Sequence, residues 1–129
     1  MKIALLGYGK MGKVIERIAL ERGHEIVLKK DENNTYEGLE KADVAIDFSV
    51  PMAAVENISN CFHANVPVVS GTTGWLEHYD EIIALCQEKK GGFISSANLQ
   101  RIGSESFASA VETSPTWPGP CWNWSYGNV

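Results

Sequence analysis

The stretch Gly7-Tyr8-Gly9-Lys10-Met11-Gly12 decides how this chain folds, because it separates two different patterns. Residues 3–6 are apolar and fit a short strand, whereas residues 14–20 have helical periodicity. A G-x-G-x-x-G run between a strand and a helix is typical of a dinucleotide-binding turn, in which the glycines allow a tight bend and a close approach to the pyrophosphate. We therefore predict that residues 7–12 bind a dinucleotide. The alternative is an ordinary glycine-rich turn.

Composition and charge limit the class of protein. The chain has 129 residues, enough for one domain, and a formal net charge of −5, which argues against nucleic acid or an anionic membrane as a partner. No apolar run approaches membrane-spanning length, and Gly7 interrupts the apolar start, so we expect no membrane segment and no signal peptide. Three cysteines without a C-x-x-C pair favour a cytoplasmic protein, and the histidines have no metal-ligand spacing.

Strand and helix patterns alternate along most of the chain. Strands are expected at residues 3–6, 25–28, 43–48, 66–70 and 93–95, and helices at residues 14–20, 51–64 and 76–89. This alternation predicts an α/β fold, a Rossmann-like doubly wound parallel sheet with the strand order 3-2-1-4-5. The ligand is then expected at the carboxyl ends of the first and fourth strands, where that order reverses.

One acidic residue stands where such a fold binds ribose. Asp31 follows Gly12 by 19 residues, at the end of the second strand, where a carboxylate can accept hydrogen bonds from the adenine ribose. The alternative is an acid that only solvates a polar loop. Glu32 follows directly, and two adjacent carboxylates repel the 2′-phosphate of NADPH, which Lys29 and Lys30 offset only in part. We predict NADH or NADPH as the cofactor, with NADH bound at least as well as NADPH.

Two further segments narrow the function. Asp47-Phe48-Ser49-Val50-Pro51 ends the third strand, and Gly71-Thr72-Thr73-Gly74-Trp75 ends the fourth. With Met11-Gly12, they resemble the cofactor domain of 4-hydroxy-tetrahydrodipicolinate reductase (dihydrodipicolinate reductase) of bacterial lysine and diaminopimelate synthesis. That family has a turn ending in Met-Gly, a D-F-[ST]-x-P segment, a G-T-T-G-[FW] loop and an A-N-F-S segment. The resemblance covers residues 1–98, the predicted dinucleotide-binding domain.

The resemblance implies a set of site residues. Residues 7–12 would hold the pyrophosphate and Asp31 the ribose, with Phe48 also at the cofactor. Gly71, Thr72 and Thr73 would border the nicotinamide, with Thr73 also at the substrate carboxylates. The segment Ser96-Ala97-Asn98 matches the start of A-N-F-S, which lies near the nicotinamide in the family. A helix N-cap is an alternative role for the two threonines, and both roles can coexist.

The resemblance ends after Asn98. Leu99 stands where the family has Phe, and no segment matches the family's H-H-x-x-K or D-A-P-S-G-T. Those segments belong to a second domain that supplies the general acid, substrate contacts and the sheet that forms the homo-oligomer. We therefore assign no catalytic residue and expect the isolated chain to be inactive, since a general acid typically contributes about 10²–10⁴ in rate.

Residues 99–129 differ from the rest of the chain. Only Glu105 and Glu112 are charged after Ile102, and three of the four tryptophans and three of the five prolines lie there. No sustained strand or helix period is present. One interpretation is a genuine or disordered tail that docks on the sheet or on a partner. The other, which we favour, is a frame-shifted translation of a truncated gene.

These observations predict the cofactor-binding half of an enzyme that reduces 4-hydroxy-tetrahydrodipicolinate, a small dicarboxylate, to tetrahydrodipicolinate. A non-catalytic NAD-binding or interaction fragment is an alternative from another class. A third is a different Rossmann oxidoreductase, such as a relative of aspartate or homoserine dehydrogenase, although the loop at residues 71–75 argues against it.

Overall fold

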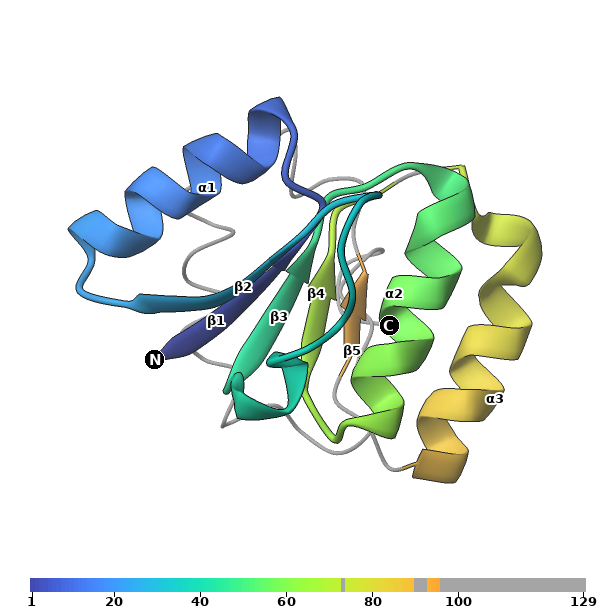
Figure 1. Cartoon of the computed structure of the whole chain (residues 1–129). Coiled ribbons are helices and arrows are strands. Elements are labelled where there is room, and N and C mark those ends of the chain that lie inside the picture. Colours follow the sequence, from blue (N-terminus) through green and yellow to red (C-terminus); the bar gives the residue numbers. More distant parts are fainter. Residues whose placement is uncertain (73, 90–92, 96–129) are drawn as a thin grey trace.

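The computed structural model describes residues 1–72, 74–89 and 93–95, which form one parallel sheet with α-helices on both faces (Figure 1). The strands are β1 (Lys2–Leu6), β2 (Glu25–Lys30), β3 (Val44–Asp47), β4 (Val68–Ser70) and β5 (Phe93–Ser95). The helices are α1 (Lys10–Glu21), α2 (Pro51–His63) and α3 (Tyr79–Lys89), with 3-10 turns η1 (Leu39–Lys41) and η2 (Leu76–His78). The predicted alternation is confirmed. The first helix starts at Lys10, four residues before the predicted position, so the turn itself is short.

The predicted strand order is wrong at one place. The observed order is β2-β1-β3-β4-β5, because β3 pairs with β1 instead of lying outside β2. All four residues of β3 are buried, as a central strand of a parallel sheet requires. In β2 only Leu28 is buried, and its charged residues suit a strand at the edge. The order therefore reverses between β1 and β3, and the expected ligand position moves from the fourth strand to the third.

Alternating side chains of β1 build a core on each face of the sheet. Ile3 and Leu5 pack in one buried cluster with Ile15 of α1. Ala4 and Leu6 belong to a larger cluster on the face that α2 and α3 cover. Further members of this larger cluster are Ile58, Cys61, Phe62, Trp75, Ile82, Cys86 and Phe93. Each fully buried large apolar side chain contributes about 1.5–3 kcal/mol, so the two clusters hold the sheet between its helices.

The three α-helices begin at the same edge of the sheet, where the parallel strands end (Figure 1). Pro51 is the first residue of α2, where its missing N–H leaves no helical hydrogen bond unmade. The edge therefore collects the N-terminal ends of the helices, whose free N–H groups favour anions. None of the helices in the described ranges combines the length and apolar character needed to cross a membrane.

Candidate functional site

The glycine turn closes tightly against two neighbouring segments. Gly7 has a φ of 107° and donates its N–H to the carbonyl of Lys30 at 2.9 Å. A Cβ atom at Gly7 would lie 2.0 Å from the carbonyl oxygen of Phe48, and one at Gly12 would lie 2.5 Å from the carbonyl oxygen of Gly7. Only glycine fits at these two positions, which bring α1 and the loop after β3 against the end of β1.

Gly9 has the opposite surroundings. A Cβ atom there would meet nothing within 4 Å, so the backbone faces open space. Gly9 is also the N-cap of α1, and no side chain caps this helix. Lys10 and Met11 follow as the first exposed residues of the helix. The uncapped N–H groups of this first turn can therefore bind an anion such as a pyrophosphate.

A cleft with a volume of about 830 Å³ opens beside the turn, within the range of small-molecule sites. Its walls come from the glycine turn, the end of β2, the loop after β3 and the first turns of α2. The residues that line the cleft include Gly7, Tyr8, Gly9, Lys30, Asp31, Glu32, Tyr36, Phe48, Ser49, Glu56 and Asn57. Three carboxylates and one ammonium group thus line the cleft, which makes its wall net negative.

Asp31 directly follows β2, and it makes hydrogen bonds within the loop that begins there. Its Oδ1 accepts the N–H of Asn33 at 2.8 Å, while its own N–H donates to Oδ1 of Asn34 at 2.8 Å. Asn34 also donates from Nδ2 to the carbonyl of Lys29 at 2.8 Å. Both interpretations of Asp31 therefore have support, because the residue organises its loop and also lines the cleft.

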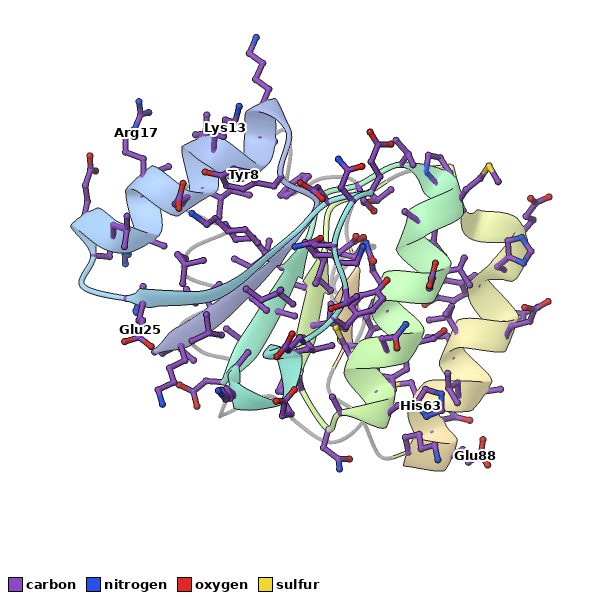
Figure 2. All side chains as sticks on the ribbon, in the orientation of Figure 1. Tyr8, Lys13, Arg17, Glu25, His63 and Glu88 are labelled. Carbon is purple, nitrogen blue, oxygen red and sulfur yellow. The ribbon has the colours of Figure 1, made fainter. Side chains whose placement is uncertain are left out.

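Tyr8 belongs to a charged cluster that the sequence did not indicate. Its hydroxyl donates to Oε1 of Glu16 at 2.5 Å, and Lys29 pairs with Oε2 of Glu16 at 3.1 Å. Figure 2 shows Tyr8 beneath α1, and the ammonium groups of Lys13 and Lys29 lie 5.9 and 5.3 Å from the centre of its ring. The hydroxyl of Tyr8 and the ammonium of Lys29 hold the pKa of Glu16 below its usual 4.5. Lys29 thus forms an ion pair with Glu16.

A second unpredicted cluster surrounds Asp47, which is fully buried at the end of β3. Its Oδ1 accepts from Oγ of Ser49 at 2.7 Å and from Nδ2 of Asn57 at 3.0 Å. Its Oδ2 accepts from the hydroxyls of Ser70 and Thr72, both at 2.8 Å. Asp47, Ser49 and Thr72 lie in the segments 47–51 and 71–75 that the sequence singled out, but the sequence did not show that their side chains meet.

The network continues away from the sheet. The hydroxyl of Tyr36 donates to Oδ1 of Asn57 at 2.5 Å, and burial raises the pKa of this tyrosine to about 12, with the charge of Glu56 adding to the effect. The ammonium of Lys30 lies 5.0 Å from the centre of the Tyr36 ring and donates to the carbonyl of Asp31. One set of contacts therefore joins β3, α2 and the loop after β2.

The structure describes only some of the residues that were predicted to lie around the nicotinamide. Phe48 lies in the cleft wall, and its ring covers Gly71, where a Cβ atom would come within 2.3 Å of the ring. Thr72 is buried, and its hydroxyl donates to Asp47 while accepting the N–H of Ser49 at 2.8 Å. It does not cap α3, because η2 precedes that helix. Thr73 and the segment 96–98 lie outside the described residues.

Metal-ligating residues do not gather in the part of the chain that the structure describes, where no group of three or more His, Cys, Asp or Glu could hold an ion. His63 lies at the end of α2, at the edge of the sheet opposite the glycine turn (Figure 2). Nδ1 of His24 lies 3.0 Å from the N-terminal amine. The polar side chains that line the cleft are carboxylates, hydroxyls, amides and the ammonium group of Lys30.

Comparison with known proteins gives one consistent result. A family model described as dihydrodipicolinate reductase, N-terminus, matches residues 1–99. A curated protein from Christiangramia forsetii named 4-hydroxy-tetrahydrodipicolinate reductase is 52% identical over 102 residues, which cover 77% of this chain and 42% of the relative. A protein of the same name from Staphylococcus carnosus is 38% identical over 106 residues, covering 74% and 43%. The chain thus spans less than half the length of these relatives.

A solved structure shares the fold. A hyperthermophilic archaeal homoserine dehydrogenase mutant in complex with NADPH superimposes with a TM-score of 0.56 at 16% sequence identity. The match covers 71% of this chain and 42% of that one. At this identity the likeness concerns the fold alone.

Proposed function

Because this chain belongs to the dihydrodipicolinate reductase family, we propose that it forms the cofactor-binding part of a 4-hydroxy-tetrahydrodipicolinate reductase. The observation that carries the proposal is the cleft in which the open backbone at Gly9, the uncapped start of α1 and the carboxylate of Asp31 come together. These groups match the pyrophosphate and the ribose of a nicotinamide dinucleotide. We also propose a cytoplasmic location.

The proposed roles follow from the chemistry of each group. Backbone N–H groups at Gly9, Lys10 and Met11 would donate to the pyrophosphate, and Asp31 would accept from the ribose hydroxyls. Residues 71–73 would lie beside the nicotinamide, with Thr73 donating its hydroxyl to a substrate carboxylate. When bound, the nicotinamide supplies the hydride. The substrate would be a cyclic dicarboxylate that loses water on reduction, and the general acid would come from outside this chain.

Cofactor preference is a second part of the proposal, and the charge of the cleft supports it. Lys29 is paired with Glu16, and the ammonium of Lys30 lies 5.0 Å from the centre of the Tyr36 ring, so both ammonium groups already have partners that would compete with a 2′-phosphate. The carboxylates of Asp31 and Glu32 would repel that phosphate. We therefore expect NADH to bind at least as tightly as NADPH.

Fluorescence titration of the chain with each cofactor tests this preference. Glu32→Arg should shift the ratio of affinities towards NADPH by tenfold or more, because it replaces a repelling carboxylate with a guanidinium. Glu37→Arg is the matched control, since Glu37 is exposed nearby but does not line the cleft. A wild-type chain that binds NADPH at least tenfold more tightly than NADH would contradict the preference. A chain that binds neither cofactor would contradict the proposed function.

A further inference from the structure

Asp47 is fully buried, and its carboxylate contacts residues on two sides of the proposed site. Ser49 and Asn57, bonded to its Oδ1, line the cleft on the side of Asp31. Ser70 and Thr72, bonded to its Oδ2, end β4 and begin the loop that leads to residues 73–75. The two oxygens of one carboxylate therefore contact the two sides of the site separately.

The partners of Asp47 also make hydrogen bonds to one another. Asn57 also donates to Oγ of Ser49 at 3.2 Å, and the N–H of Ser49 donates to Oγ1 of Thr72 at 2.8 Å. The main chain of Asp47 takes part too, because its carbonyl accepts the N–H of Gly71 at 2.9 Å. A buried carboxylate with four donors around it resists rotation, because any rotation leaves a donor without its acceptor.

We infer that Asp47 is a positioning residue for the dinucleotide: through Ser49 and Thr72 it sets the spacing between the adenosine side and the nicotinamide side of the cofactor site. The inference rests on the proposed function. A dinucleotide contacts both sides at once, so a change in their spacing weakens binding of the whole molecule. A ligand that occupies only the adenosine side is far less sensitive to that spacing.

The test compares NADH with AMP on the full 129-residue chain. Asp47→Asn keeps the shape of the side chain but turns one acceptor oxygen into a donor, so at least one pair of donors loses its partner. We expect the Kd for NADH to rise tenfold or more, while the Kd for AMP rises less than threefold. Asp43→Asn is the matched control, because it removes the same charge at the opposite end of β3, where the carboxylate is exposed and accepts the N–H of Lys2 at 2.8 Å.

Ser70→Ala provides a second route if Asp47→Asn does not fold. Ser70 is fully buried and does not line the cleft, so any effect on NADH must pass through Asp47 and Thr72. We expect a severalfold rise in the Kd for NADH with the Kd for AMP unchanged. Equal losses for NADH and AMP, or no loss for either in a folded variant, would overturn the inference while wild-type binding upholds the proposed function. Failure of the wild-type chain to bind NADH would overturn both.

Discussion

At Gly7 and Gly9 the same residue type serves two different physical needs. The Cβ position of Gly7 is filled by the carbonyl of Phe48, and its φ of 107° lies in the region that other residues avoid. Gly9 has an ordinary negative φ of −91° and an empty Cβ position. Packing within the fold therefore requires glycine at position 7, whereas at position 9 the fold leaves room for a side chain, and a glycine there suits the close approach of a pyrophosphate.

Gly9→Ala separates these two needs. We expect the free energy of unfolding to fall by no more than about 1 kcal/mol, because alanine is a poorer helix N-cap than glycine. NADH binding should fall at least tenfold, since the added methyl group occupies the approach to the pyrophosphate. Thermal unfolding and fluorescence titration measure the two quantities.

Gly7→Ala is the contrasting variant. Its strained φ alone costs about 1–3 kcal/mol, and the overlap with the Phe48 carbonyl adds to that cost. It should therefore lower the unfolding midpoint well below that of Gly9→Ala. If Gly9→Ala bound NADH as the wild type does, residues 9–11 would not hold the pyrophosphate.

At the scale of elements, local patterns were readable from the sequence and pairings between distant segments were not. The unit formed by β1, the glycine turn and α1 follows from neighbouring residues, so it could be predicted. The position of β3 beside β1 depends on which strand lies at the edge of the sheet. The charged residues Glu25, Lys29 and Lys30 indicate that β2 is this edge strand. The prediction followed the common order 3-2-1-4-5 instead of this indication, and it therefore placed β3 outside β2.

The candidate site divides in the same way. The glycine turn and Asp31 follow a known spacing, and the structure brings both to one cleft. The partners of Asp47 come from β4, α2 and the loop after β3. Their contacts depend on the strand order, so they could not be predicted without it. The N-cap role considered for Thr72 failed because η2 intervenes before α3.

The contact between α1 and β2 predicts a specific dependence of stability on pH. The hydroxyl of Tyr8 and the ammonium of Lys29 lower the pKa of Glu16 from its usual 4.5 in the folded state. A carboxyl group with a depressed pKa stabilises the fold above about pH 4.5, and this contribution is lost as the pH falls through the folded-state value. Glu16→Gln should therefore melt at a lower temperature than the wild type at pH 7, and the difference should shrink towards pH 3.

Glu21→Gln is the control for this prediction, because Glu21 is exposed at the end of the same helix. Thermal melts at several pH values between 3 and 7 provide the measurement. A gap between Glu16→Gln and the wild type that stays constant over this range would show that the Glu16 carboxylate is not the source of the stabilisation.

At the scale of the whole molecule, the site lies at the edge of the sheet where the parallel strands end. The cleft at the ends of β1, β2 and β3 offers groups that bind and orient a dinucleotide. The relatives are more than twice as long as the aligned part, since the matches cover only 42–44% of them. Cofactor binding and turnover are therefore separable properties, and the proposed function predicts that this chain has the first without the second.

Complementation tests that separation. The chain is mixed with the remaining, C-terminal part of the Christiangramia forsetii relative, and oxidation of NADH is followed with 4-hydroxy-tetrahydrodipicolinate as substrate. We expect turnover to rise at least 100-fold over the chain alone, because the added part would supply the general acid, which typically contributes about 10²–10⁴. The Gly9→Ala chain should gain far less in the same mixture, since its defect lies in cofactor binding. NADH binding without any rescue would instead favour a non-catalytic binding module, because the cofactor site would then be intact in a chain that cannot join the rest of the enzyme.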